Sequence, residues 1–197
     1  MKNSFVLFGC GGHARSVAAV ILDNDPSAEI IFVDEKAQDG EKILGFPVIT
    51  NIPSDAKNIF VAIGDNKKRK KISEGKKLIS IISSRATISA GAIIEDGCFV
   101  ASGAYIGPQT HIGQGTIINT HTVIEHEVDI GNFCHIAPHT TICGRSHLGN
   151  YVFLGAGSTV IDKIHVCSDV IIGAGGVVVR DITMEGTYVG CPVKRRL

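Results

Sequence analysis

A cluster of polar side chains between residues 119 and 139 is the part of this sequence best suited to proton-transfer chemistry. It contains Asn119-Thr120-His121 and Glu125-His126-Glu127, followed by His135 and His139. An imidazole titrates near neutral pH, and it therefore suits the role of a general base. We expect a catalytic centre in this segment.

A glycine-rich turn near the N-terminus is a second candidate site. The sequence predicts a strand at Ser4 to Phe8, a tight turn at residues 9–13, a helix at Ala14 to Leu22, and a strand at Ile30 to Val33 that ends at Asp34. The spacing Gly9-x-Gly11-x-x-Ala14 matches the dinucleotide-binding fingerprint, in which glycines let phosphate oxygens approach a helix N-terminus. The alternative is that these glycines form only a tight strand-to-helix turn.

Two further strands are expected at Pro47 to Thr50 and Ile59 to Ile63. The second runs into Gly64-Asp65-Asn66 and a helix whose basic run, residues 67–71, we interpret as a solvated face. Four strands in about eighty residues make half a Rossmann fold, and a dehydrogenase would need a second half or a catalytic domain with hydride chemistry. The pattern therefore favours a nucleotide-sugar site over an NAD site.

The rest of the chain is a repeat that must position the histidine cluster. Every sixth residue from Ile88 to Val178 is aliphatic, in sixteen of sixteen positions. A period of six matches neither an α-helix nor a single alternating strand, but it suits short extended segments joined by regular bends, which indicates a β-helix. Glycines that follow several aliphatic positions, such as Gly107 and Gly113, are expected to provide the tight or left-handed backbone of the corners.

Composition narrows the possible partners and the compartment. The 197 residues carry no formal net charge, so nothing attracts nucleic acid or an anionic membrane. Six scattered cysteines are typical of free thiols in a reducing compartment. The apolar stretch from Phe5 to Phe8 is too short for a signal peptide and no segment could span a membrane, so we expect a cytoplasmic protein without membrane insertion.

Four features together resemble the bacterial PglD/NeuD-like sugar acetyltransferases of the hexapeptide-repeat class. They are the Gly-x-Gly-Gly-His motif at 9–13, Phe32-Val33-Asp34-Glu35, Val61-Ala62-Ile63-Gly64-Asp65-Asn66, and the repeat itself. The resemblance implies an α/β half-Rossmann domain that binds a nucleotide sugar, at 1–83, followed by a left-handed parallel β-helix acetyltransferase domain with a C-terminal tail, at 84–197. It also implies acetyl-CoA as co-substrate, no metal, and a homotrimer with sites between neighbouring β-helices.

The resemblance assigns the substrate-binding residues of the first domain. In the PglD branch this domain holds a UDP-linked 4-amino-4,6-dideoxy sugar, and the matching positions are Gly11, Gly12, His13, Asp34, Glu35 and Gly64. Asp34-Glu35 departs from the Asp-Asp of that branch.

The resemblance also assigns catalytic roles. His126 matches the general base and Glu127 the carboxylate that raises its basicity, while His135, Ala156 and Ala174 match positions that contact acetyl-CoA. Adjacent residues on a straight strand point to opposite faces, so His126 and Glu127 must lie at a corner to meet. The resemblance implies a coil of 18 residues, which stacks Gly144 on His126 and leaves space for a substrate carbonyl, with the Gly144 N–H as oxyanion donor.

Several alternatives remain open. Transfer to a sialic-acid hydroxyl competes with transfer to a sugar amine. The spacing of His121 and His126 also occurs in β-helical zinc carbonic anhydrases, and a non-catalytic nucleotide-sugar binder is the third alternative. The small residues at the corners of Ala156 and Ala174 could serve packing alone. The tail Gly190-Cys191-Pro192-Val193-Lys194-Arg195-Arg196 could contact CoA phosphates or be a frayed terminus.

Overall fold

The N-terminal part of the chain is a parallel sheet with two helices. The computed structural model describes residues 3–54 and 56–196. In chain order the elements are β1 (Ser4–Phe8), α1 (Gly12–Asn24), β2 (Glu29–Val33), β3 (Lys42–Ile43), β4 (Phe46–Ile49), β5 (Asn58–Val61) and α2 (Asn66–Ser73). The sheet order is β3-β4-β2-β1-β5, and all neighbours are parallel except β3 and β4. This order confirms the half-Rossmann prediction, to which it adds the short strand β3.

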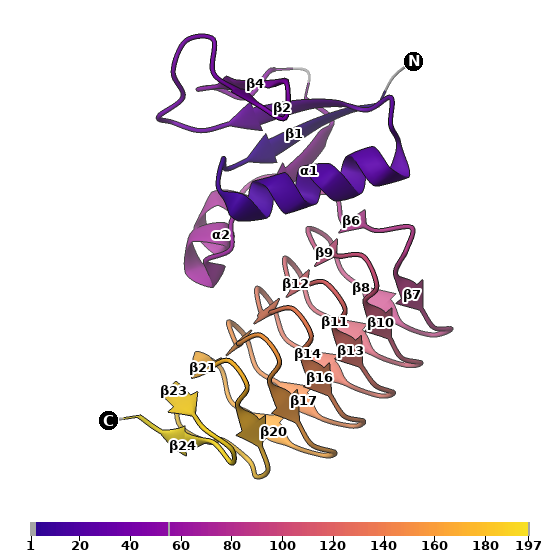
Figure 1. Ribbon diagram of the computed structural model, residues 1–197, viewed down its shortest axis with the longest axis vertical. Coiled ribbons are helices and arrows are strands. Elements are labelled where there is room, and N and C mark those ends of the chain that lie inside the picture. The colour runs from indigo at the N-terminus through magenta and orange to yellow at the C-terminus, as the bar shows by residue number, and fades with distance from the viewer. Residues whose placement is uncertain (1–2, 55, 197) are drawn as a thin grey trace.

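The remainder of the chain is a left-handed parallel β-helix with three faces (Figure 1). The first face contains β6 (Ile81–Ile82), β9 (Phe99–Val100), β12 (Ile117–Ile118), β15 (His135–Ile136), β18 (Phe153–Leu154), β21 (Val170–Ile172), β23 (Gly186–Val189) and β24 (Lys194–Arg195). The second contains β7 (Thr87–Ile88), β10 (Tyr105–Ile106), β13 (Val123–Ile124), β16 (Thr141–Ile142), β19 (Thr159–Val160) and β22 (Val177–Val178). The third contains β8 (Ile93–Ile94), β11 (His111–Ile112), β14 (Asp129–Ile130), β17 (His147–Leu148) and β20 (His165–Val166).

Residues 18 apart are paired in register, as the coil length requires. Tyr105 pairs with Val123, which pairs with Thr141, and the other faces follow the same rule up to β21, which pairs with β23 at a spacing of 16. The sixth-residue aliphatics point inward, and from Val100 onward they are almost completely buried in one continuous core. Each such side chain contributes roughly 1.5–3 kcal/mol when it leaves water, so the repeat itself supplies most of the driving force for this part of the fold.

The corners use glycine in a different way from the one expected. The left-handed backbone falls at every sixth residue from Gly91, and many of these residues are not glycine, for example Glu127 with φ 57°. Gly107 and Gly113 have no positive φ; they are crowded by the next coil, and a Cβ at Gly113 would lie 2.7 Å from the backbone carbonyl carbon of Gly131. These glycines therefore permit close stacking of the coils, and the prediction that they supply left-handed corners is wrong.

The N-terminal domain sits on the first face of the β-helix, at its N-terminal end (Figure 1). Phe99, Ala101 and Ile117 from this face belong to the same buried cluster as the helix and strands of the N-terminal domain. Helix α2 lies along the corner between the third and first faces, where Lys70 stands over the Phe133 ring and Lys67 pairs with Asp169. The two domains are thus held against each other by both apolar and charged contacts.

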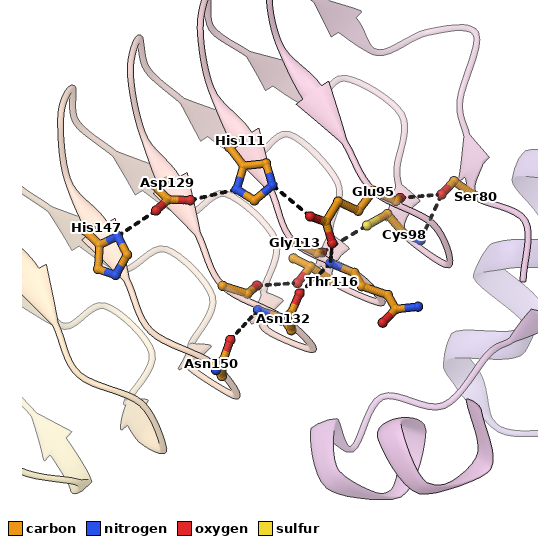
Figure 2. A network of polar contacts seen from close by, with 12 residues as sticks. Ser80, Glu95, Cys98, His111, Gly113, Thr116, Asp129, Asn132, His147 and Asn150 are labelled. Atoms are coloured by element: carbon orange, nitrogen blue, oxygen red, sulfur yellow. Dashed lines mark hydrogen bonds and ion pairs between the residues drawn. The ribbon is translucent and has the colours of Figure 1, made fainter. Parts of the chain in front are cut away.

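The outer surface of the third face carries a ladder of alternating acids and histidines. Asp129 lies between His111 and His147, with carboxylate-to-Nδ1 distances of 2.8 and 2.9 Å (Figure 2). The other nitrogen of His111, Nε2, is 3.0 Å from Glu95. These side chains are partly exposed and lie on a face away from the N-terminal domain.

Cysteines and helices agree with the composition analysis within the described residues. All six cysteines are free thiols, and burial raises the pKa of Cys98 and Cys134 to about 12. In the same part of the chain, neither α1 nor α2 has the length and apolar character needed to cross a bilayer.

Candidate functional site

Three loops meet at the carboxyl edge of the N-terminal sheet. β1 lies between β2 and β5, and these strands lead into the loops at residues 9–11, 34–35 and 64–65. From β1 the chain continues to β2 and β4 on one side of the sheet, whereas β5 lies on the other side of β1. This reversal makes the edge a topological switch point, the place where open α/β sheets bind ligands. The predicted substrate-binding residues lie in these loops or, for Gly12 and His13, in the first turn of α1.

The glycine loop combines one structurally required glycine with two that leave space. Gly9 has φ 108°, and a Cβ there would lie 3.0 Å from the Ala62 carbonyl oxygen. A Cβ at Gly11 or Gly12 would meet nothing within 4 Å, and Gly11 caps α1 without a side chain. The first turn of α1 therefore has no side-chain cap, and its two glycines leave room for a ligand, as at phosphate-binding helix ends.

Asp34 and Glu35 follow β2 at the same edge. Asp34 is half-buried, and its Oδ1 accepts a hydrogen bond of 3.0 Å from the Lys36 N–H. Burial and the nearby Asp34 raise the pKa of the Cys10 thiol to about 11. Glu35 is exposed. One carboxylate is thus held by its own turn, and the other is free to reach a ligand.

His13 and His135 bring the two domains together. Their ring centroids are 6.2 Å apart, and His13 also meets the Phe99 ring at 5.2 Å. Burial lowers the pKa of His13 to about 3 and that of His135 to about 4, so both imidazoles are neutral at physiological pH. His135 Nδ1 is 3.1 Å from the Gly64 carbonyl oxygen, whereas the buried Nε2 of His13 has no hydrogen-bond partner among the described residues.

A cavity of about 680 Å³ opens beside His135, between the first face, the start of α2 and the C-terminal segment. Its lining consists of Gly64, Asp65, Asn66, Lys67, His135, Tyr151, Phe153, Asp169, Ile171, Glu185, Gly186 and Arg195. Of the predicted site residues, it contains Gly64 and His135. Lys194–Arg195 forms strand β24 against β23, and Arg195 lines this cavity, so this part of the tail is not frayed.

His126 and Glu127 occupy the corner between the second and third faces, as the corner argument requires. Glu127 takes the left-handed backbone conformation, which turns its side chain back towards its neighbour. His126 Nδ1 lies 2.9 Å from Glu127 Oε2. Because a carboxylate only accepts, Nδ1 carries the proton and Nε2 is left with a lone pair in the neutral ring. This is the arrangement of a base oriented by an acid.

Gly144 lies one coil beyond His126 and is covered by its ring. A Cβ at Gly144 would come within 2.6 Å of both Cε1 and Nε2 of His126. The space left by the absent side chain is therefore taken by the imidazole, and the expectation that it stays free for a substrate carbonyl is wrong. Among the hydrogen bonds of residues 3–54 and 56–196, none uses the Gly144 N–H.

Ala156 and Ala174 lie at a different corner, between the first and second faces. Both are exposed, and the Ala156 carbonyl accepts a hydrogen bond from the Gly175 N–H. The same corner carries His121 and His139, whose rings stack at 5.3 Å. His121 is thus at another corner from His126, and no group of side chains suited to hold a metal ion occurs in the described part of the chain.

One chain does not bring all the predicted site residues together. His126, Glu127 and Gly144 share one corner, Ala156 and Ala174 share another, and His135 lies on the first face with the N-terminal loops. The prediction of a solvated basic face on α2 is wrong for Arg69, which is 1% exposed and completely hydrogen-bonded. Its only sequence signal is that it is the single arginine among lysines.

Comparison with known proteins is consistent with this geometry. The PglD N-terminal domain family matches residues 4–76. None of the curated proteins compared with the chain matches it.

Solved structures match over nearly the whole chain. The acetyltransferase domain of PglB from Neisseria gonorrhoeae, in complex with acetyl coenzyme A, is 31% identical with a TM-score of 0.93 and 100% coverage of both chains. A histidine-to-alanine variant of GDP-perosamine N-acetyltransferase from Caulobacter crescentus, in complex with CoA and GDP-perosamine, is 31% identical with a TM-score of 0.90, covering 98% of this chain and 97% of that one. WeeI from Acinetobacter baumannii, at 19% identity and a TM-score of 0.86, shares the fold. The protein therefore belongs to the PglD/NeuD-like sugar acetyltransferases and is itself an acetyltransferase.

Proposed function

We propose that the protein transfers the acetyl group of acetyl-CoA to the amine of a nucleotide-linked amino sugar, as a cytoplasmic step of bacterial glycan biosynthesis. A UDP-linked 4-amino-4,6-dideoxy-N-acetyl-hexosamine is the first acceptor to test. A GDP-linked amino sugar is the second, because the Caulobacter relative binds GDP-perosamine together with CoA.

The observation that carries this proposal is the corner pair of His126 and Glu127. With Nδ1 engaged by the carboxylate at 2.9 Å, the Nε2 lone pair of His126 can take a proton from an attacking amine. The carboxylate then stabilises the imidazolium that forms, which raises the basicity of the ring. Of the described histidines, His126 is the one whose neighbour along the chain holds it in this way.

The reaction is a direct acyl transfer. The neutral amine nitrogen attacks the thioester carbonyl carbon, the nitrogen loses its proton to His126 Nε2, and the C–S bond breaks. The proton then passes from His126 to the leaving thiolate, which yields CoA and the acetamide. The Gly144 N–H, which donates no hydrogen bond within the described part of the chain, is our candidate donor to the oxyanion.

We propose a division of labour between residues 1–83 and 84–197. Phosphates of the nucleotide would lie at the open N-terminus of α1, at Gly11 and Gly12, with Asp34, Glu35, His13 and Gly64 around the nucleoside and sugar. Acetyl-CoA would lie along the β-helix, with its arm at the corner of Ala156 and Ala174 and its acetyl end near His135.

A second chain is required to complete this site. His126 lies at the corner of the second and third faces, while His135 and the N-terminal loops lie on the first face. If both histidines act on one substrate, they must come from neighbouring chains, and a homotrimer with sites between its β-helices meets this requirement.

The direct test follows the release of CoA thiol from acetyl-CoA in the presence of the two acceptors. We expect His126→Ala to lower kcat by roughly 10²–10⁴-fold, the usual effect of removing a general base, with little change in acetyl-CoA affinity. The control is His165→Ala, because His165 is an exposed histidine of the third face. Retained turnover in His126→Ala would remove this residue from the mechanism. Turnover with a sialic-acid hydroxyl and none with either amine would favour O-acetylation.

Mixing two variants of reduced activity, each lacking one of the two histidines, tests the shared site. Chains with His126→Ala and chains with His135→Gln, mixed randomly in trimers, should regain about a quarter of the sites with both native histidines. No recovery would show that one chain supplies both groups.

A further inference from the structure

Arg69 is the most deeply buried charged side chain of the described residues, and it lies where the two domains meet. A guanidinium has five N–H donors, and here each one reaches an acceptor at 2.7–3.1 Å. The acceptors are the carbonyl oxygens of Gly115, Ile63, Gly64 and Cys134 and the side-chain oxygen of Asn66.

These acceptors are neutral, and no carboxylate forms a salt bridge with Arg69 among residues 3–54 and 56–196. Burial lowers the pKa of Arg69 to about 10, so the group keeps its charge at neutral pH. A buried cation without a counter-ion is costly, and its complete hydrogen bonding is what makes it tolerable. An apolar side chain would fill the interface between α2 and the β-helix at a lower free-energy cost, so the buried charge calls for a further explanation.

The explanation lies in the Gly64 carbonyl, which Arg69 shares with His135. This oxygen lies 3.1 Å from Arg69 Nη1 and 3.1 Å from His135 Nδ1. Because a carbonyl oxygen only accepts hydrogen bonds, His135 must carry its proton on Nδ1. In the neutral ring the Nε2 atom then has a lone pair, and it can accept a hydrogen bond but cannot donate one.

Arg69 also opposes protonation of this ring. Burial and the charge of Arg69 hold the pKa of His135 low, at about 4, against the favourable hydrogen bond to Gly64. The hydrogen bond to Gly64 keeps the proton on Nδ1, and the lowered pKa prevents protonation of Nε2. His135 therefore stays neutral with one fixed proton where it lines the cavity beside the N-terminal loops.

We propose that Arg69 is a positioning residue that, through the Gly64 carbonyl, fixes His135 in the Nδ1–H tautomer and presents Nε2 as an acceptor for an N–H group of the bound substrates. The inference rests on the proposed function for the identity of those substrates. It has a consequence for the chemistry: His135 is an acceptor of substrate N–H groups and does not donate to the thioester oxygen, so the oxyanion donor must come from elsewhere, such as the Gly144 N–H.

The tautomer can be measured on the full-length protein without any substrate. Protein labelled with ¹⁵N-histidine is studied by long-range ¹H–¹⁵N NMR, and the signals of His135 are identified by their loss in His135→Gln. We expect the Nδ1–H tautomer at pH 7 and no protonation of this ring down to about pH 5, given its pKa of about 4. An Nε2–H tautomer would overturn the proposal, whatever the turnover of the variants.

Arg69→Lys tests the link between the two residues. A lysine has three donors and cannot satisfy five acceptors, so His135 should lose its single tautomer, and kcat should fall about 10- to 100-fold, as expected when a reacting group is misplaced by about 1 Å. Lys71→Gln is the matched control, since Lys71 is exposed on the same helix, and it should change neither the spectrum nor kcat.

A double variant separates positioning from general support of the fold. In the His135→Gln background, Arg69→Lys should lower kcat by less than about 2-fold, because the residue through which it acts is already gone. An equal loss in both backgrounds would overturn the proposal. If no acceptor is acetylated by any of these proteins, the proposed function fails, while the tautomer measurement still decides the role of Arg69.

Discussion

Gly144→Ala is the substitution that most directly tests the geometry of the proposed catalytic corner at His126 and Glu127. A Cβ at this position would lie 2.6 Å from His126 Nε2 and Cε1, whereas ordinary contacts begin at 3.4 Å. The imidazole must therefore retreat by about 0.8 Å or rotate away from Glu127, and a misplacement of about 1 Å at a reacting group can cost on the order of 10²-fold in rate. We expect kcat to fall by about that factor while the Gly144 N–H itself is retained.

The free energy of unfolding of Gly144→Ala should rise slightly or stay the same. Gly144 has no positive φ, and replacing such a glycine by alanine reduces the entropy of the unfolded chain, which typically stabilises by about 0.4–1 kcal/mol. The His126 side chain is partly exposed at its corner and can swing outward without opening the core. A variant that melts at the native temperature yet has lost most of its kcat is therefore the expected result.

The assay is thiol release under saturating acetyl-CoA, run in the native and His126→Ala backgrounds together with thermal unfolding of each protein. Once the imidazole is absent, Gly144→Ala has nothing to displace and should have almost no further effect. A kcat within twofold of the native value, or an equal loss in both backgrounds, would refute the steric reasoning and return Gly144 to a role in packing or substrate contact.

Three further predictions concern Glu127, Asp34 and His111. Glu127→Gln should lower kcat by at least about 10-fold, as loss of the carboxylate does for an oriented histidine base in catalytic triads, with KM for acetyl-CoA unchanged in steady-state kinetics. Asp34→Asn keeps an oxygen for the Lys36 N–H but loses the charge, so KM for the nucleotide sugar should rise about 10-fold with an unchanged melting temperature; an unchanged KM would refute the pocket. On the third face, hydrogen bonding to Asp129, and then to Glu95, raises the pKa of His111 above its model-peptide value of 6.5. The protonated His111 therefore stabilises the folded protein fully below pH 6.5, and this stabilisation is lost as the pH rises through the raised pKa. Melting curves at pH 6 and pH 8.5 should show His111→Asn less stable than the native protein at the lower pH and equal to it at the higher, and equal differences at both would contradict the assignment.

The sequence predicted the fold because its strongest signal is periodic. Aliphatic residues at a constant spacing of six, buried together from Val100 to Val178, require a coil, and the fingerprint at Gly9 to Ala14 specifies one βαβ unit. Each of these patterns can be recognised within a short stretch of sequence, and each specifies the structure of that stretch and of the segments next to it. The short strand β3 was missed because its two residues, Lys42–Ile43, carry no alternation that a pattern could detect.

The candidate site was predicted less completely because it depends on contacts between distant segments. Nothing local distinguishes Arg69 from the lysines around it, and its burial follows from the docking of α2 against carbonyl groups of Gly115 and Cys134. The spacing Gly107, Gly113 and Gly131 signals a need for glycine, but whether that need is a positive φ or a close approach depends on the next coil. The contact of His126 with Glu127, by contrast, involves adjacent residues, so the resemblance could assign the pair and corner geometry permits the contact.

The separation of His126 from His135 has a simple origin in the repeat. The two residues are nine apart in a coil of 18, so half a turn of the β-helix lies between them and they cannot share a face. The aliphatic core that joins the faces is completely buried, and closing the gap within one chain would require unpacking several side chains worth roughly 1.5–3 kcal/mol each. Assembly of two chains would bring His126 of one chain near His135 of the other without unpacking the core. In a rigid coil, the sequence spacing of the two histidines therefore determines that a joint action on one substrate must be shared between subunits.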